Sequence, residues 1–332
     1  MKARINGLLR AGLLVTMTVL PCTAAFAHGD GTPHEQPIWT WTPEQITQHV
    51  SRVRAGDDLT PKSWPGGARV AVSISFDFDT EPVWIGFQEQ SSPSYMSRGE
   101  YGARAGMPRI LKLMDKHDIP GTFFIPAMTM ELHPEVVAKL KDRDDVEIGF
   151  HSYVHENPMR LTAAEERKVY AQAMDIFMKH VGRKPVGFRS AAWDLTESTV
   201  SIVKEMGFLY ESSMMADDRP YALMVNGKDT GLVELPVEWI LDDWPLFQIS
   251  WPDKHVAARN ADDVYSIWKE EFDGAYEEGT MYILTTHPQV IGHRYRMAML
   301  DRLIAYMKSK DGVWFATHEE IARYVKEQAA GE

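Results

Sequence analysis

The chain has 332 residues, of which 44% are hydrophobic and 25% are charged, and its formal net charge is −12 at pH 7. This composition is typical of a globular protein and excludes a largely disordered chain. The acidic excess is unsuited to phosphate backbones and anionic lipids, so we expect no nucleic-acid partner.

The first residues have the pattern of a secretory signal peptide, which we assign to residues 1–27. Basic residues precede an apolar run from Leu8 to Leu20, and Ala25-Phe26-Ala27 is a small-x-small site for signal peptidase. A membrane span needs roughly 20 apolar residues, more than this run provides. We therefore expect cleavage after Ala27, no stable membrane insertion after cleavage, and a periplasmic or secreted protein.

The only cysteine, Cys22, lies inside the predicted signal peptide. The mature chain would therefore contain neither a disulfide nor a thiolate ligand, and any metal would have to bind to nitrogen and oxygen atoms. Cleavage would also remove Lys2, Arg4 and Arg10, which lowers the Lys and Arg total from 35 to 32 against 47 acidic residues and gives a formal charge of −15.

Residues 28–68 are rich in Pro, Gly, Trp and Thr and are expected to form an N-terminal arm. A capping threonine introduces one predicted helix, Pro43 to Arg54. The apolar side chains of Trp39, Trp41 and Trp64 could dock on the chain's own barrel or on a neighbouring copy. A homo-oligomer is therefore one expectation.

From Arg69 onward, predicted strands and helices alternate. Short apolar runs predict strands at 70–76, 121–126, 146–150, 186–189, 208–211, 233–237, 281–286 and 313–316. Helical patterns occur at 105–116, 134–142, 163–181, 197–206, 261–277, 294–308 and from 318 onward. Seven or eight parallel strands covered by helices indicate an α/β fold with a closed or nearly closed barrel, and an open doubly wound sheet is the alternative. We assign residues 69–332 to one catalytic domain.

Polar side chains follow several of these strands, at the edge where active sites of such folds form. Asp77 and Asp79 come two residues apart after the first strand. In an extended chain both carboxylates project to one side, so they would converge on one point. Solvated loop acids are the alternative, although the preceding strand is apolar and phenylalanines flank the pair.

His151 and His155 follow the third strand with a spacing of four. On a helical turn this spacing places both imidazoles on one face, as in many zinc sites, whereas surface histidines on a capped turn are the alternative. A carboxylate from a neighbouring strand end would complete an N, N, O ligand set with open positions. Zn²⁺ suits such a site best, and Co²⁺ or Ni²⁺ could substitute.

With one acid on the metal, the other acid is free to take a proton from a bound water, whose pKa the cation lowers. Hydrolysis of an amide also needs an acid that protonates the leaving nitrogen. His287 follows the strand at 281–286 and suits this task by type and position. A histidine packed at a strand end is the alternative.

Four motifs, taken in order, resemble those of the polysaccharide deacetylases, also called the NodB-homology or carbohydrate esterase family four proteins. The motifs are Phe76 to Asp79, His151 to His155, Gly187-Phe188-Arg189 and Thr286-His287-Pro288. The resemblance covers about residues 69 to 325 and implies a distorted (β/α) barrel of the NodB-homology type.

The resemblance also implies a role for each matching position. These roles are Asp77 as the catalytic base, Asp79, His151 and His155 as metal ligands, Arg189 as the group that orients the base, and His287 as the acid. Together they imply a metal-dependent hydrolase of carbon-nitrogen bonds other than peptide bonds.

The sequence departs from the common family pattern at two places, and in both it resembles a divergent branch of the family. Phe78 separates the two acids, and Ser190-Ala191-Ala192 follows Arg189 where many relatives have a proline. That branch contains peptidoglycan deacetylase-like proteins, and its neighbours include allantoinase-like and cyclic imide hydrolases. The resemblance therefore implies the type of bond that is cleaved and leaves the substrate open.

Three hypotheses for function follow. The first is N-deacetylation of an N-acetylated glycan, such as peptidoglycan or a chitin-type oligosaccharide, because export would bring the protein to such glycans. The second is hydrolysis of a small cyclic imide or ureide, for which a narrow pocket in place of a groove would be diagnostic. The third is a non-catalytic glycan-binding protein on the same fold, and the presence of both Asp77 and His287 argues against it.

Supporting roles at the site are expected for Glu81, Trp193, Asp243 and Trp244. The tryptophans could stack on sugar rings or belong to the core, and we expect Trp239 in the core. Asp243 could hold His287 in its charged form, or it could be a turn acid paired with an arginine.

Overall fold

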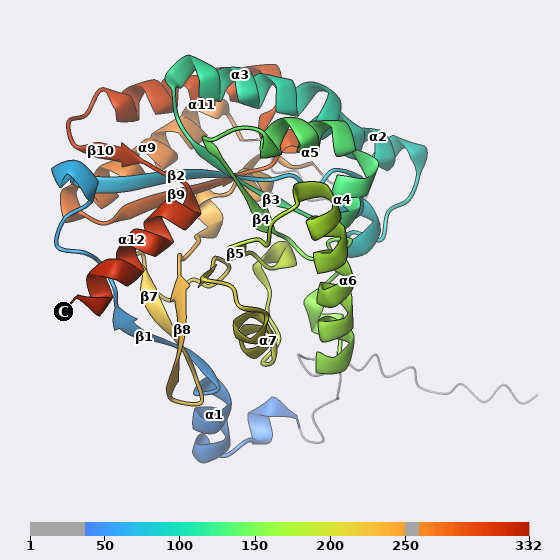
Figure 1. Ribbon diagram of the computed structural model, residues 1–332, viewed down its shortest axis with the longest axis vertical. Helices are drawn as coiled ribbons and strands as arrows, with labels where there is room; N and C mark the ends of the chain where they lie inside the picture. The colour runs from blue at the N-terminus through green and yellow to red at the C-terminus, as the bar shows by residue number, and fades with distance from the viewer. Residues whose placement is uncertain (1–36, 250–258, 332) are drawn as a thin grey trace, which may run out of the picture.

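The computed structural model describes residues 37–249 and 259–331, in which helices cover a curled ten-stranded sheet (Figure 1). The strands are β1 (Val53–Asp58), β2 (Val70–Asp77), β3 (Gly121–Ile125), β4 (Val146–Phe150), β5 (Gly187–Phe188), β6 (Tyr210–Glu211), β7 (Tyr221–Val225), β8 (Lys228–Glu234), β9 (Met281–Thr286) and β10 (Val313–Phe315). The predicted signal peptide lies outside the described residues.

The helices alternate with these strands over most of the chain. They are α1 (Pro43–Val50), α2 (Pro93–Tyr101), α3 (Met107–His117), α4 (Ala127–Leu132), α5 (Pro134–Lys141), α6 (Ala163–Val181), α7 (Thr199–Met206), α8 (Asp243–Phe247), α9 (Ala261–Glu278), α10 (Pro288–Ile291), α11 (Arg294–Lys308) and α12 (His318–Ala330). No helix within the described ranges is long and apolar enough to cross a bilayer.

The sheet follows the order β1-β7-β8-β6-β5-β4-β3-β2, and β9 and β10 both pair with β2. Eight strands run parallel, whereas β1 and β7 pair antiparallel. An isolated parallel bridge joins Asp242, after β8, to Thr285 on β9, and so brings the two ends of the parallel set together. The predicted distorted barrel of seven or eight parallel strands is confirmed, and the open doubly wound sheet is excluded.

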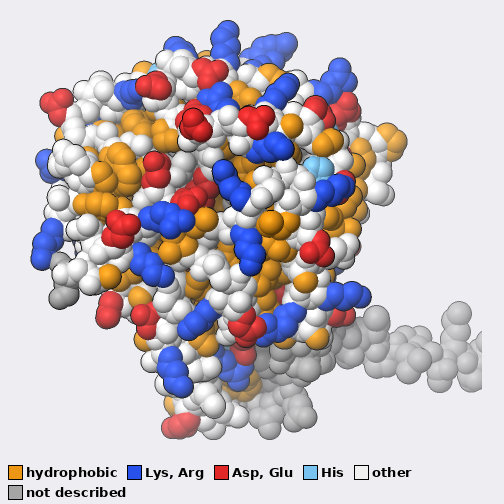
Figure 2. Space-filling view, viewed as in Figure 1, with side chains coloured by type: hydrophobic (Ala, Val, Ile, Leu, Met, Phe, Trp, Pro, Cys, Tyr) orange, Lys and Arg blue, Asp and Glu red, His pale blue; other side chains and the backbone are white. Residues whose placement is uncertain are grey.

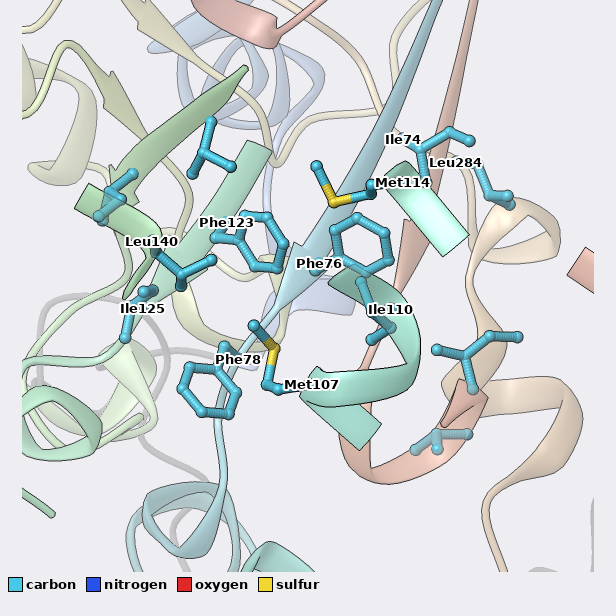
Figure 3. Packing of buried hydrophobic residues seen from close by; sticks show 14 of the residues in the cluster. Ile74, Phe76, Phe78, Met107, Ile110, Met114, Phe123, Ile125, Leu140 and Leu284 are labelled. Carbon is cyan, nitrogen blue, oxygen red and sulfur yellow. The ribbon is translucent and has the colours of Figure 1, made fainter. Parts of the chain in front are cut away.

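Strand β2 separates an apolar layer from a polar barrel interior. Phe76 packs toward the helices, where its ring stacks on Phe123 with 4.8 Å between centroids, and side chains of α3 such as Ile110 and Met114 lie beside the two rings (Figure 3). Because side chains alternate along a strand, the next residues face the barrel interior. The last of these inward residues is Asp77, so the alternation of β2 delivers an acid to the inside of the barrel.

Helices begin and end at the residues that helix chemistry favours. The side chain of Thr162 accepts from the backbone N–H of Glu165 and opens α6 with a capping box, and Gly182 closes the helix with a φ of 81°. Thr317 and Glu320 form the same capping box at the start of α12. These caps fix the first residues of α6 and α12.

The predicted helix at 43–54 is correct only as far as Val50. Residues 53–58 form β1, which pairs antiparallel with β7. Helix α1 buries none of its side chains, so the chain leaves the helix where pairing with a sheet edge becomes available. Further along the arm, Trp64 is buried against Trp314 on β10, with 6.0 Å between ring centroids.

Residues 221–234 form a β-hairpin that the sequence interpretation did not include. Asn226 and Gly227 have φ values of 49° and 73°, which a type I′ turn requires at both central positions. The strand predicted at 233–237 therefore begins earlier, at Lys228, and ends at Glu234.

Acidic and basic side chains are interspersed on the face of the molecule seen in Figure 2, with apolar patches between them. The net negative charge is thus not gathered into one patch on this face.

Candidate metal centre and active site

The two acids at the carboxyl end of β2 are Asp77, its last residue, and Asp79, two residues beyond it. Asp77 is 2% exposed and Asp79 is fully buried. Asp77 Oδ2 lies 3.9 Å and Asp79 Oδ1 lies 3.4 Å from Nε2 of His151. The structure therefore brings both carboxylates to the same imidazole.

The two histidines after β4 do not lie on a helical turn, so that expectation is wrong. Residues 151–157 form a loop in which Ser152 and His155 adopt φ values of 67° and 55°. The carboxylate of Glu156 accepts hydrogen bonds from the backbone of Val154 and the hydroxyl of Ser152, which hold the loop in shape. The loop brings the imidazoles of His151 and His155 to 5.0 Å between ring centroids. Left-handed backbone at non-glycine residues is strained, and such residues cluster at functional sites.

Asp79, His151 and His155 form a donor set that fits a divalent cation. Asp79 Oδ2 lies 3.7 Å from Nε2 of His155, and the candidate ligand atoms of the three residues lie within 4.8 Å of one another. Both oxygens of Asp79 and Nε2 of His151 are buried without a hydrogen-bond partner among the described residues. Unpaired buried polar atoms are costly, and a metal ion would satisfy all three.

The protonation of these groups suits metal binding. Burial lowers the pKa of His151 to about 4 and holds the pKa of His155 well below its usual range, so both imidazoles are neutral, as metal ligands must be. Burial raises the pKa of Asp79 well above its usual range, and the charge of Asp77 adds to the effect although His287 opposes it. A bound cation would therefore favour the ionised form of Asp79, which burial disfavours.

Arg189 connects the base candidate to a ligand candidate. Its Nη1 donates to Asp77 Oδ1 at 2.8 Å, and its backbone carbonyl lies 2.8 Å from Nδ1 of His151. A proton on that Nδ1 leaves Nε2 of His151 free for a metal. Burial alone would raise the pKa of Asp77, but the charge of Arg189, together with that of His287, outweighs burial and lowers it.

His287 directly follows β9, faces the acids and is held by Asp243, the first residue of α8. The Nδ1 of His287 lies 2.7 Å from Asp243 Oδ1, and its backbone N–H donates to both carboxylate oxygens at 3.1 Å. Its Nε2 lies 3.6 Å from Asp79 Oδ2. Burial lowers the pKa of His287, but Asp242 and Asp243 outweigh burial and raise it well above its usual range.

Asp242 is a site residue that the sequence interpretation missed. Its Oδ1 lies 3.5 Å from Nδ1 of His287 and caps α8 by accepting from the backbone N–H of Trp244 at 2.7 Å. Burial raises the pKa of Asp242 to about 7. Asp242, Asp243 and His287 are close enough to hold an ion. However, Asp243 already occupies the imidazole nitrogen on that side, so we interpret the group as a carboxylate support for His287.

A cavity of about 220 Å³ opens onto these groups. Its lining consists of Asp77, Asp79, Val83, Phe87, Gln88, His155, Ala192, Trp193, Trp239, Asp242, Trp244 and His287. Trp193 and Trp239 pack with 4.5 Å between ring centroids, and Trp244 lies edge-on to His287 at 5.2 Å. The two acids and His287 thus line the same pocket as three tryptophans.

Trp239 is 41% exposed, so the expectation that it belongs to the core is wrong. It lies on a single 3₁₀ turn, Trp239–Leu241, none of whose residues is buried. Trp193, by contrast, is only 7% exposed. Trp193 is therefore buried within the wall of the cavity, and Trp239 lies at its rim.

Glu81 does not join the site. Its carboxylate lies 2.8 Å from Nε2 of His133, and it is absent from the cavity lining. Val83, Phe87 and Gln88 line the cavity instead, from a π-helical turn that spans Val83–Phe87 and the residue after it. No periodicity in the sequence predicts such a turn. The acids Asp242 and Asp243, by contrast, are adjacent in the sequence, and this could have indicated that both belong to the site.

Comparison with protein families gives one match: the model named Polysaccharide deacetylase matches residues 88–210. This stretch contains the two histidines of the loop and Arg189. A curated relative, the peptidoglycan deacetylase of Helicobacter pylori, is 28% identical over 279 residues, which are 76% of this chain and 95% of the relative.

Two solved structures are similar over most of their length. A candidate polysaccharide deacetylase of Mycobacterium smegmatis is 33% identical, with a TM-score of 0.76 over 83% of this chain and 96% of that chain. The Puue allantoinase is 30% identical, with a TM-score of 0.69 over 79% of this chain and 91% of that chain. Similarity thus extends to proteins named for two different substrates.

Proposed function

Because the chain belongs to the polysaccharide deacetylase family, we propose that it is an exported, metal-dependent hydrolase that removes acetyl groups from an N-acetylated glycan such as peptidoglycan or a chitin-type oligosaccharide. One observation carries the proposal. The unpartnered oxygens of Asp79 and the unpartnered Nε2 of His151 converge with His155, between a carboxylate held by arginine and a histidine held by carboxylates. The signal-peptide pattern of residues 1–27 supports export.

Asp79, His151 and His155 would hold the metal, and Zn²⁺ suits their oxygen and nitrogen donors, with Co²⁺ or Ni²⁺ as substitutes. When bound, such an ion lowers the pKa of a coordinated water and polarises a carbonyl oxygen. Asp79 and His155 line the cavity, so water and substrate would reach the metal from the cavity.

Asp77 would act as the general base. One of its oxygens is engaged by Arg189 at 2.8 Å, and the residue lines the cavity, so its other oxygen can accept a proton from the attacking water. The lowered pKa of Asp77 keeps the carboxylate ionised before that transfer. Arg189 thus orients the base and keeps it charged.

His287 would act as the general acid. Its Nδ1 is held by Asp243, which leaves Nε2 facing the reaction centre. The raised pKa of His287 keeps a proton on the ring at neutral pH, and cleavage of an amide requires that proton on the departing nitrogen. Base and acid therefore lie in different protonation states because their neighbours carry opposite charges.

The aromatic walls support a sugar substrate. The face of an indole such as that of Trp239 is a surface on which a sugar ring can stack, and its partial exposure leaves it accessible at the cavity rim. The curated relative named as a peptidoglycan deacetylase supports the same substrate class.

A second candidate is hydrolysis of a small cyclic imide or ureide. It is favoured by the depth of the site, since Asp77, Asp79 and His287 are at most 6% exposed, and by the similarity to an allantoinase. A polymer would have to present its acetamide group into this cavity, whereas a small ring would enter whole.

Purified protein loaded with Zn²⁺ should release acetate from acetylated chitooligosaccharides or peptidoglycan fragments. A panel of cyclic imides and ureides is assayed in parallel with the same preparation. Turnover of an imide with no acetate from any glycan would contradict the proposed substrate and favour the second candidate. No turnover of either class would favour a glycan-binding protein without catalysis.

A further inference from the structure

The guanidinium of Arg189 has every donor occupied. Arginine carries five N–H groups, and this fully buried side chain is enclosed by an equal number of acceptors. The donors and acceptors are Nε to Ser212 O at 3.0 Å, Nη1 to Ser75 Oγ at 2.8 Å and to Asp77 Oδ1 at 2.8 Å, and Nη2 to Ser212 Oγ at 2.9 Å and to His318 Nε2 at 3.2 Å. Four of these acceptors come from strands or from residues that directly follow them, whereas His318 comes from α12.

His318 is suited to be a fixed acceptor. Because its Nε2 accepts from the guanidinium, Nδ1 must carry the ring proton, which it donates to Ser73 Oγ at 2.7 Å. Its backbone N–H donates to Thr122 Oγ1 at 2.9 Å. The ring is fully buried, and Phe124 packs against it at 5.4 Å between centroids. The imidazole thus has one tautomer and one orientation.

The surroundings also keep this imidazole neutral. Burial, reinforced by the charge of Arg189, holds the pKa of His318 well below its usual range. A protonated ring would put a cation against the guanidinium and would remove the acceptor.

We propose that His318 is a positioning residue for the reaction: by accepting from Nη2 of Arg189, it fixes the guanidinium in the plane in which Nη1 meets Asp77. This inference rests on the proposed function, in which Asp77 is the base. Without the acceptor, one buried N–H would be unsatisfied, and the guanidinium would turn to find a partner. This rotation of the guanidinium would move Nη1 away from the Asp77 carboxylate.

Attachment of α12 to the barrel does not depend on the imidazole alone. Thr317 and Glu320 cap the helix through their own hydrogen bonds, and the backbone N–H of Glu319 donates to the buried carboxylate of Glu147 at 2.7 Å. The positioning role of His318 can therefore be separated from helix stability with a matched control at Thr317.

The first test compares His318→Leu, His318→Gln and Thr317→Ala in metal-loaded protein with an accepted substrate. We expect His318→Leu to lower kcat about tenfold with little change in KM, as for other groups that orient a catalytic side chain. His318→Gln should regain most of kcat because its amide oxygen reaches the position of the imidazole Nε2 and can accept the Nη2 proton. Thr317→Ala should lower the melting temperature and leave kcat unchanged. Wild-type kcat in His318→Leu, or an equal loss of kcat in Thr317→Ala, would overturn the proposal.

The second test needs no turnover, so it separates failure of this inference from failure of the proposed function. In protein labelled with ¹⁵N-arginine, the side-chain N–H signals of Arg189 are identified by their absence in Arg189→Lys. We expect these protons to exchange slowly in wild type and in Thr317→Ala, and much faster in His318→Leu. If exchange is equally slow in His318→Leu, His318 does not hold the guanidinium and the proposal is wrong, whatever substrate the protein hydrolyses.

Discussion

Asp77 and Arg189 form an ion pair inside the barrel, with 2.8 Å between Oδ1 and Nη1, and neither side chain is more than 2% exposed. Such a pair joins the end of β2 to the residue after β5, two segments more than a hundred positions apart in the chain. Because only one carboxylate oxygen is engaged, the pair fixes the acid without consuming its capacity to accept a proton.

Substitution of Asp77 by Asn should therefore abolish most turnover while the metal stays bound. The amide oxygen can still accept from Arg189, but it cannot take a proton from water, and loss of a general base typically costs a factor of about 10² to 10⁴ in rate. The assay is acetate release together with metal content by elemental analysis. An Asp77→Asn protein with wild-type activity would show that another group is the base.

Removal of the metal should destabilise the wild type but not an Asp79→Ala variant. The Asp79 carboxyl is buried with both oxygens unpartnered, so the metal-free protein bears the cost of buried polar atoms that nothing satisfies. A ligand at about 100 times its Kd stabilises the folded state by about 2.7 kcal/mol.

Thermal unfolding with and without a chelator measures this difference. We expect the chelator to lower the Tm of the wild type and to leave the Tm of Asp79→Ala unchanged. Equal shifts in the two proteins would mean that the ion lies elsewhere.

The rate should fall on the alkaline side as His287 loses its proton. Asp242 and Asp243 raise the pKa of His287, so the acid form is fully present below that raised pKa and is lost as the pH rises through it. Asp243→Asn removes one negative charge and therefore lowers the pKa, which should move the alkaline fall in kcat to lower pH. Glu81→Gln is the control, since Glu81 pairs with His133 outside the cavity. An unchanged profile in Asp243→Asn would exclude His287 as the titrating acid.

The barrel was predictable because its strands are short and apolar and its helices carry capping residues. The run Val70 to Phe76 and the capping box at Thr162 are local signals, and both elements occur where they were expected. The β7–β8 hairpin also had a local signal, Asn226-Gly227, which the sequence interpretation did not use. The end of α1 had no local signal in the sequence, because the helix stops where β1 begins to pair with β7.

The site was predictable at the ends of strands and unpredictable elsewhere. Asp77 and His287 are placed by parallel strands, whose carboxyl ends meet at one edge of the sheet. The helical turn expected around His155 is instead a loop with positive φ values, since the surrounding contacts override local spacing. His318 and Asp242 matter only through residues distant in sequence, so no local pattern could assign them a partner.

Trp239→Ala should raise KM for an oligosaccharide severalfold and change kcat and stability little. The indole is 41% exposed at the cavity rim, so little core packing is lost, while a stacking surface for a sugar ring disappears. Trp39→Ala is the matched control, because Trp39 is 87% exposed and does not line the cavity. If the two variants have the same KM for the oligosaccharide, the rim tryptophan does not contact the substrate.

Gly86→Ala should weaken metal binding although residue 86 is not a ligand. A Cβ built on Gly86 would lie 2.0 Å from the carbonyl oxygen of Val154 and 3.0 Å from that of His155, closer than real Cβ contacts allow. The backbone atoms it meets belong to the loop that carries the candidate ligand, so the loop must move and His155 with it. Gly274→Ala is the control: it lies in α9 with no atom within 4 Å of its Cβ, and alanine there should stabilise the helix by roughly 0.5–1 kcal/mol. Isothermal titration with Zn²⁺ should show a Kd at least tenfold higher for Gly86→Ala than for Gly274→Ala. Equal affinities would mean that the position of this loop does not control the ligand set.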